Sequence, residues 1–228
     1  MQLSAVLFTA LFCWSCDLHD LDNYAGPDSK IHGGIYDIET GELIEQDILQ
    51  GMQIEYTELG YSNPVMQYLV VKNDGTYRNN QMFSGKYTIQ PVRGNFVPVP
   101  VQGIEVSGDT KVDFRVQPYI RFNSVNIARE GNKVIARFTI NPTVGNNVRN
   151  VALFAHREPN VGNPLHTVSS VTAVNSMVYP GTEYTLEIDL EQHQQALKSG
   201  EQYYFRVGAL IDAPEAKYNY VPAVRIAL

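Results

Sequence analysis

The sequence has little cysteine, tryptophan and positive charge. Only two cysteines occur among 228 residues, which excludes a disulfide-rich scaffold. Lysine and arginine number 17 against 24 aspartates and glutamates, so the formal net charge is −7. This balance gives no basic patch of the kind that binds nucleic acid. No apolar run reaches the ~20 residues that are needed to span a bilayer as a helix.

Common catalytic and metal-binding patterns are also missing. No two of the five histidines are three to five residues apart, which excludes a helical metal-binding pair. The sequence has no Gly-x-Ser-x-Gly nucleophile elbow and no phosphate-binding glycine loop. Paired glycosidase carboxylates converge only in the fold, so Glu55, Glu58, Glu183 and Glu187 stay open as candidates. We expect a protein that is not an enzyme and holds no metal and no cofactor.

The first fifteen residues have the composition of a secretory signal. Met1–Ser15 carry no charge, and Leu3–Trp14 are almost wholly apolar, as in the apolar region of a signal peptide. Ser15 precedes Cys16, after which the chain becomes polar. This pattern resembles the bacterial lipoprotein signal, which implies that Cys16 is acylated and anchors the chain to a membrane. The alternative is a buried N-terminal segment with two ordinary cysteines.

Three acidic residues, Asp17, Asp20 and Asp22, follow this cysteine. They resemble the surface-export signal of Bacteroidetes-type lipoproteins, which implies an outer-membrane protein that faces the cell surface. A solvated acidic tether is the alternative interpretation. We therefore assign residues 1–15 to the signal peptide and residues 16–28 to a lipidated tether.

Residues 29–117 predict a first β domain. Aromatic and β-branched residues recur there, with Gly, Asn or Pro every ~8–12 residues. The stretches Asn73-Asp74-Gly75-Thr76-Tyr77 and Gly85-Lys86-Tyr87-Thr88-Ile89 resemble the carboxypeptidase-regulatory or CnaB-like β-sandwich. In that fold the two stretches form adjacent strands of a small transthyretin-like domain.

Residues 118–228 predict a second β domain. Seven short strands are expected there, at Ile120–Ala128, Lys133–Asn141, Arg149–His156, Leu165–Val171, Tyr184–Asp189, Gln202–Ile211 and Val221–Ala227. This number favours an immunoglobulin-like or fibronectin III-like sandwich, so the fold class is all-β with two tandem β-sandwiches. The spacing of Leu197 and Tyr203, six residues apart, resembles the tyrosine corner of fibronectin-type domains. In that motif the tyrosine hydroxyl forms a hydrogen bond with backbone upstream in the sequence. A short helix is expected over Asp189–Ser199, capped by Asp189 and ended by Gly200.

The order of these parts resembles a two-domain Bacteroidetes surface-lipoprotein family of unknown function. The most distinctive residues are Asp22-Asn23-Tyr24 followed by Pro27 and Gly33. The resemblance implies association with starch-utilisation-type glycan uptake systems. A receptor or porin complex of that type and a polysaccharide are therefore candidate partners, besides the membrane itself.

Tyrosine and asparagine are the candidate ligand-binding residues. Sugar rings stack their apolar C–H faces on aromatic planes, and a few polar groups orient them. Such residues lie in three expected loop regions: Tyr61 with Asn63, Tyr77, and Tyr218 with Tyr220. The alternative at each position is a structural tyrosine at a strand edge.

Three functions are consistent with the sequence. The favoured one is an accessory glycan-binding lipoprotein of the outer membrane. The second is a structural or adaptor lipoprotein that contacts a receptor complex without binding sugar. The third is a hydrolase whose carboxylates meet only in the folded chain.

Overall fold

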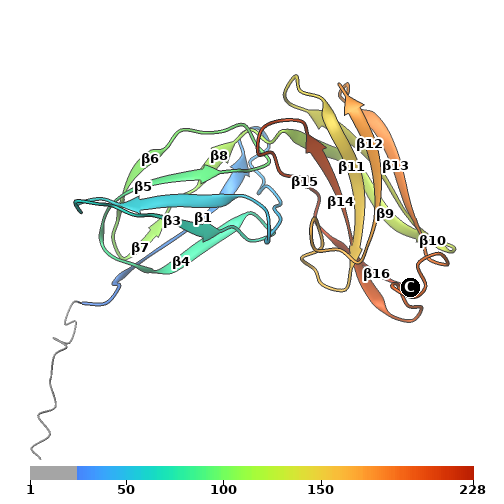
Figure 1. Ribbon diagram of the computed structural model, residues 1–228, viewed down its shortest axis with the longest axis horizontal. Coiled ribbons are helices and arrows are strands. Elements are labelled where there is room, and N and C mark those ends of the chain that lie inside the picture. The colour runs from blue at the N-terminus through green and yellow to red at the C-terminus, as the bar shows by residue number, and fades with distance from the viewer. Residues whose placement is uncertain (1–24) are drawn as a thin grey trace, which may run out of the picture.

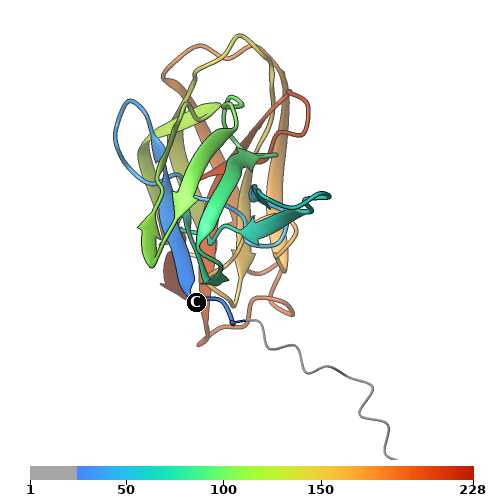
Figure 2. The same ribbon diagram turned by 90° about the vertical axis from the view of Figure 1, so that its left-hand side faces the viewer.

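The computed structural model describes residues 25–228, so Cys16 and the expected signal peptide lie outside the described residues. The described part contains sixteen strands and no helix, and it therefore holds no helix that could cross a membrane. Two β-sandwiches follow each other along the long axis of the molecule (Figure 1), and in the view along that axis the N-terminal one lies in front (Figure 2). The prediction of an all-β chain with two tandem sandwiches is confirmed.

The N-terminal sandwich is built from two sheets, with strand orders β4–β1–β7 and β3–β2–β5–β6, and β8 also pairs with β1. The strands are β1 (Ser29–Asp37), β2 (Gln53–Glu58), β3 (Met66–Val70), β4 (Thr76–Met82), β5 (Gly85–Val92), β6 (Gln102–Val106), β7 (Asp109–Lys111) and β8 (Phe114–Val116). Alternate residues point inward, so Ile54 and Tyr56 on β2 pack with Ile89 on β5 in one core. The residues between them face outward, as the two-residue period of a strand requires.

One expectation about this domain is wrong. The resemblance placed the stretches around Tyr77 and Tyr87 on adjacent strands, but β4 pairs with β1 whereas β5 pairs with β2 and β6. The two strands follow each other closely in sequence, yet the short connection at Phe83-Ser84 crosses from one sheet to the other. Sequence proximity alone does not decide whether two strands share a sheet.

The C-terminal sandwich pairs β13–β10–β9 against β12–β11–β14–β15, with β16 on β14. The strands are β9 (Ile120–Glu130), β10 (Lys133–Pro142), β11 (Val148–His156), β12 (Val168–Ser176), β13 (Thr182–Asp189), β14 (Gln202–Ile211), β15 (Asn219–Tyr220) and β16 (Val224–Ala227). The larger core of the protein fills this sandwich and includes Phe138, Leu153 and Phe205.

The expected helix over Asp189–Ser199 is not formed, and the segment is a series of turns. Its cap is present, because Asp189 Oδ1 accepts hydrogen bonds from the backbone N–H groups of Glu191 at 2.9 Å and Gln192 at 3.1 Å. Gly200 ends the segment with a φ of 82°, a conformation that glycine adopts without strain. The capping signal was therefore read correctly, but only isolated turns follow it.

Buried amides fix the junction between the sandwiches. Asn95 donates a hydrogen bond from Nδ2 to the Tyr218 carbonyl at 3.0 Å. Asn219 donates from Nδ2 to the Asn95 carbonyl at 2.8 Å and accepts from the Ile120 N–H at 3.1 Å. Both asparagines are buried. Buried polar groups need such partners, so these bonds constrain how the two domains meet.

Candidate functional site

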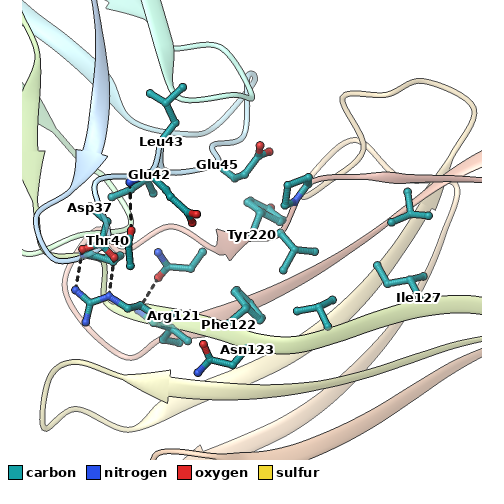
Figure 3. A pocket seen from close by; sticks show the side chains of 18 residues that line it. Asp37, Thr40, Glu42, Leu43, Glu45, Arg121, Phe122, Asn123, Ile127 and Tyr220 are labelled. Atoms are coloured by element: carbon teal, nitrogen blue, oxygen red, sulfur yellow. Dashed lines mark hydrogen bonds and ion pairs between the residues drawn. The ribbon is translucent and has the colours of Figure 1, made fainter.

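A groove of about 550 Å³ lies between the two sandwiches. One wall is the segment from Asp37, the last residue of β1, to Glu45; the other is the first part of β9, from Ile120 to Ile127 (Figure 3). Tyr220 also lines the groove, and Figure 3 shows it between these two segments. The volume falls within the ~300–1,000 Å³ that is usual for small-molecule sites.

The groove stays open along β9 because this strand is an edge strand of its sheet. Ser124 has a φ of 51°, and the register with β10 shifts between Arg137 and Thr139. An irregularity of this kind bends a strand away from regular pairing. The segment from Asn123 to Asn126 is therefore exposed instead of being covered by the opposite sheet.

An ion pair across the domains forms one end of the groove. Arg121 on β9 donates from Nε and Nη2 to the Asp37 carboxylate at 2.6 and 2.8 Å, and its Nη1 lies 2.7 Å from Glu39. Burial alone would raise the pKa of Asp37, but the bonds from Arg121 and from the Glu39 N–H outweigh it and lower the pKa. Asp37 is therefore held as a carboxylate.

A second ion pair lies deeper, behind Glu45. Arg206 on β14 is 1% exposed, and its Nη2 donates to Glu45 Oε2 at 2.5 Å. Burial raises the pKa of Glu45 even though Arg206 lies beside it. With both carboxylates bound to arginines, the groove offers hydrogen-bonding groups at fixed positions. Within residues 25–228, no three His, Cys, Asp or Glu side chains are grouped as a metal site requires.

Apolar side chains share the groove with these polar groups. Leu43, Phe122, Val125 and Val224 line it together with Asn123, whose amide Figure 3 shows at the lower edge. Thr40 and Glu42 also line it. The groove can therefore hold a ligand that has both apolar faces and hydroxyl or amide groups, and this combination is typical of binding sites.

Tyr218 and Tyr220, which were candidate ligand-binding residues of an expected loop, do not present their rings to a ligand. Both are buried. The Tyr218 hydroxyl donates to Asn150 Oδ1 at 2.6 Å, and the Tyr220 hydroxyl accepts from the Asn163 N–H at 3.0 Å. Tyr220 lines the groove, but Arg206 lies over its ring at 4.3 Å from the centroid. Neither ring has an open face on which a sugar could stack.

The other predicted ligand-binding residues are divided between surface and core. Tyr61 is 63% exposed and lies with Asn63 in the loop between β2 and β3, beside a separate cavity of about 340 Å³. Tyr77, by contrast, belongs to β4 and is buried. Its hydroxyl donates to the Val112 carbonyl at 2.6 Å, and burial raises its pKa. The expectation that Tyr77 lies in a loop is therefore wrong.

The predicted structural pair lies together in the C-terminal core. Leu197 and Tyr203 are both buried. The Tyr203 hydroxyl accepts a hydrogen bond from the Lys198 N–H at 2.9 Å and donates to Glu201 Oε2 at 2.9 Å. The first of these bonds joins the hydroxyl to upstream backbone, which is the geometry that the tyrosine-corner resemblance implies.

Sequence reasoning missed the charged residues that shape the groove. Asp37 and Arg121 are 84 positions apart, and Glu45 and Arg206 are 161 apart, so no local spacing connects them. One signal was available for Arg206: it interrupts the apolar stretch Tyr203–Ile211. A charge in a strand that is otherwise buried is almost always paired, which could have marked Arg206 as a partner of an acid.

Comparisons with known proteins identify both domains. Residues 29–117 match the family described as "Protein of unknown function (DUF3823) N-terminal domain", and residues 120–225 match "Domain of unknown function (DUF3823_C)". A comparison with curated proteins found no match.

Solved structures support this relationship over most of the chain. A "putative carbohydrate binding protein" from Bacteroides uniformis is 37% identical with a TM-score of 0.79, over 89% of this chain and 100% of the other. A DUF3823 family protein from the same species is 21% identical with a TM-score of 0.77, again over 89% and 100%. A DUF3823 family protein from Parabacteroides merdae is 23% identical with a TM-score of 0.76, over 89% of this chain and 100% of the other. The two DUF3823 family structures show that the fold is shared. The chain belongs to the DUF3823 family, with both of its domains present.

Proposed function

We propose that this protein is a non-catalytic carbohydrate-binding lipoprotein that captures polysaccharide at the cell surface, and that the groove between its domains receives the sugar. The observation that carries the proposal is the 37% identical structure from Bacteroides uniformis, described as a "putative carbohydrate binding protein", which is matched over its whole length. The match covers 89% of this chain and therefore spans both domains, including the segments that line the groove.

The chemistry of the groove suits a saccharide. A pyranose ring has apolar C–H faces and a rim of hydroxyl groups. Leu43, Phe122 and Val125 supply apolar surface, while Thr40 and Asn123 supply neutral hydrogen-bonding groups. The two ion pairs and the buried amides of the junction hold the walls in place. A preformed site loses less freedom on binding and so binds more tightly.

The lipid anchor belongs to the same proposal. Acylation of Cys16 would tie the chain to the outer membrane, and the acidic residues that follow would direct it to the cell surface. There it would act as an accessory to a starch-utilisation-type receptor by holding polysaccharide near it. The apolar stretch before Cys16 and the small residue beside it support this part of the proposal.

Isothermal titration calorimetry on the full chain, in a non-glycosidic detergent, tests sugar binding. The probes are neutral oligosaccharides derived from starch, cellulose, laminarin, mannan and xylan. We expect binding to one class, weakened about fivefold or more by Asn123→Ala because it removes a hydrogen-bonding group from the groove. Asn126→Ala is the matched control, since Asn126 is exposed on the same strand and does not line the groove. If none of these oligosaccharides binds, the proposal is refuted.

A structural or adaptor role is the second candidate function. No Asp, Glu, Lys or Arg occurs from residue 159 to residue 182, a stretch that includes the edge strand β12. Val171 on that strand is exposed. Edge strands usually carry charges that prevent pairing with other chains, so an uncharged one favours contact with a protein partner. The adaptor role is correct if the wild type binds none of the oligosaccharides above and Val171→Lys abolishes its co-purification with a receptor.

A further inference from the structure

The outer face of sheet β3–β2–β5–β6 carries a row of polar side chains that ends in one exposed tyrosine and is separate from the groove. In the strand register, Tyr68 on β3 lies opposite Glu55 on β2, and Glu55 lies opposite Gln90 on β5. Directly opposed side chains in antiparallel strands are ~4.5–5.5 Å apart at Cβ. All three point away from the core, because the alternate residues of these strands, Ile54 and Ile89 among them, are buried. Tyr68 is 46% exposed.

Arg93 completes this row from the loop after β5. Its guanidinium carbon lies 5.5 Å from the centroid of the Tyr68 ring, and its Nη2 lies 3.3 Å from Glu55 Oε1. A cation at this distance is attracted by the ring. The ion pair and the ring contact together hold Tyr68, Glu55 and Arg93 as one cluster. None of these residues lines the groove between the domains.

The backbone of Arg93 is itself unusual. Its φ is 52°, in the left-handed region that glycine adopts freely and other residues adopt at a cost of ~1–3 kcal/mol. Gly94, the next residue, would be the ordinary place for such a conformation, yet the arginine occupies it. Strain of this kind is often retained where it positions a functional side chain. The side chain of this residue is the one that lies over the Tyr68 ring.

We infer that Tyr68, Glu55 and Arg93 form a second saccharide-binding platform, on which a pyranose ring stacks against the face of Tyr68 that Arg93 does not cover, while Arg93 and Glu55 bond its hydroxyl groups. This inference rests on the proposed carbohydrate-binding function and adds a site to it. An open sheet face accepts an internal unit of a long chain, because no wall blocks the neighbouring sugars on either side. The groove and the platform would then hold one polysaccharide at two points, which raises the apparent affinity.

The rest of the face favours a sugar over a protein partner. Met66 and Val70 flank Tyr68 on β3, but β2 presents Gln53 and Thr57, and β5 presents Thr88 beside Gln90. Protein interfaces need a sizeable apolar core inside a polar rim. Here the apolar side chains lie on β3 and, at Val92, on β5, while Gln53 and Thr57 on the intervening β2, with Thr88 and Gln90 on β5, supply amides and hydroxyls that match sugar hydroxyl groups.

The test is calorimetry on full-chain variants with the oligosaccharide panel used for the groove. Tyr68→Ala should weaken binding of the preferred oligosaccharide about tenfold, because the stacking surface is lost. Arg93→Gly should also weaken binding, but it should not lower the unfolding temperature, since glycine relieves the left-handed backbone. If Arg93 had a purely structural role, Arg93→Gly would leave sugar binding unchanged and would lower the unfolding temperature.

Tyr179→Ala is the matched control. Tyr179 is 83% exposed in the loop after β12, so its replacement removes an exposed tyrosine of the other domain and should leave affinity unchanged. If Tyr68→Ala binds as tightly as the wild type while Asn123→Ala still weakens binding, the platform is refuted and the groove stands. If the wild type binds no oligosaccharide, both proposals fail. If Tyr68→Ala keeps sugar affinity but loses a protein partner, the face is a protein-binding surface and the inference is wrong.

Discussion

Replacing Arg206 should loosen the junction between the two domains. The guanidinium donates to the carbonyls of Val221 at 2.8 Å, Gln46 at 3.0 Å and Val161 at 3.2 Å, as well as to Glu45. Arg206→Met keeps a long side chain but leaves a desolvated carboxylate and three carbonyls without their donor. Removing one member of a buried ion pair costs ~3–5 kcal/mol. We expect a loss of about 4 kcal/mol, which lowers the unfolding temperature by roughly 8–16 °C for a chain of this size.

A double-mutant cycle with Glu45→Gln separates the ion pair from the packing. Because burial raises the pKa of Glu45, neutralising this side chain removes a charge that is costly to bury without Arg206. The double variant should therefore be more stable than Arg206→Met alone, with a coupling energy between the two sites of at least ~1 kcal/mol. Differential scanning calorimetry and urea unfolding measure both quantities. A loss below ~1 kcal/mol in Arg206→Met, or additive effects, would refute the reasoning.

Three further predictions concern a hydroxyl, a carboxylate and the lipid anchor. Tyr203→Phe should cost ~1 kcal/mol because the Lys198 N–H loses its acceptor, and an unchanged unfolding midpoint would count against the tyrosine corner. The lowered pKa of Asp37 means that its contact with Arg121 stabilises the fold above the unfolded value near 3.8 and is lost as the pH falls. Asp37→Asn should thus be less stable than the wild type near pH 6, by a difference in unfolding free energy that shrinks as the pH falls below 3.8, and a difference that stays constant in acid would contradict this. Cys16→Ala should release the protein from the membrane fraction, and persistent attachment would exclude anchoring by that cysteine.

Local patterns predicted much of the fold. Alternation in Lys133–Asn141 and Gln202–Ile211 indicated strands that the structure extends or reproduces as β10 and β14. The six-residue spacing of Leu197 and Tyr203 pointed to a bond that forms within five residues of sequence. In each case the residues that decide the structure are neighbours, so their spacing carries the information.

Features that depend on distant residues were missed. Tyr77 follows a turn and was expected in a loop, but it lies on β4 and its ring packs near Phe114 on β8. Both strands pair with β1, β4 antiparallel and β8 parallel. The strand expected at Leu165–Val171 is shifted to Val168–Ser176, since β12 pairs with β11 in a register that nearby residues do not encode. The burial of a side chain depends on which sheet packs over its strand, and the local sequence pattern does not predict that packing.

The groove and the junction depend on the same bonds, which has a consequence for binding. The wall that carries Asp37 comes from the N-terminal domain, whereas Arg121 opposes it from the C-terminal domain. Any rotation between the domains would break that ion pair and also the buried bonds of Asn95 and Asn219. The geometry of the groove is therefore as stable as the junction itself. A variant that weakens the junction, such as Arg206→Met, should lower sugar affinity in the groove even though this side chain is buried behind Glu45, and should leave the separate Tyr68 face unaffected.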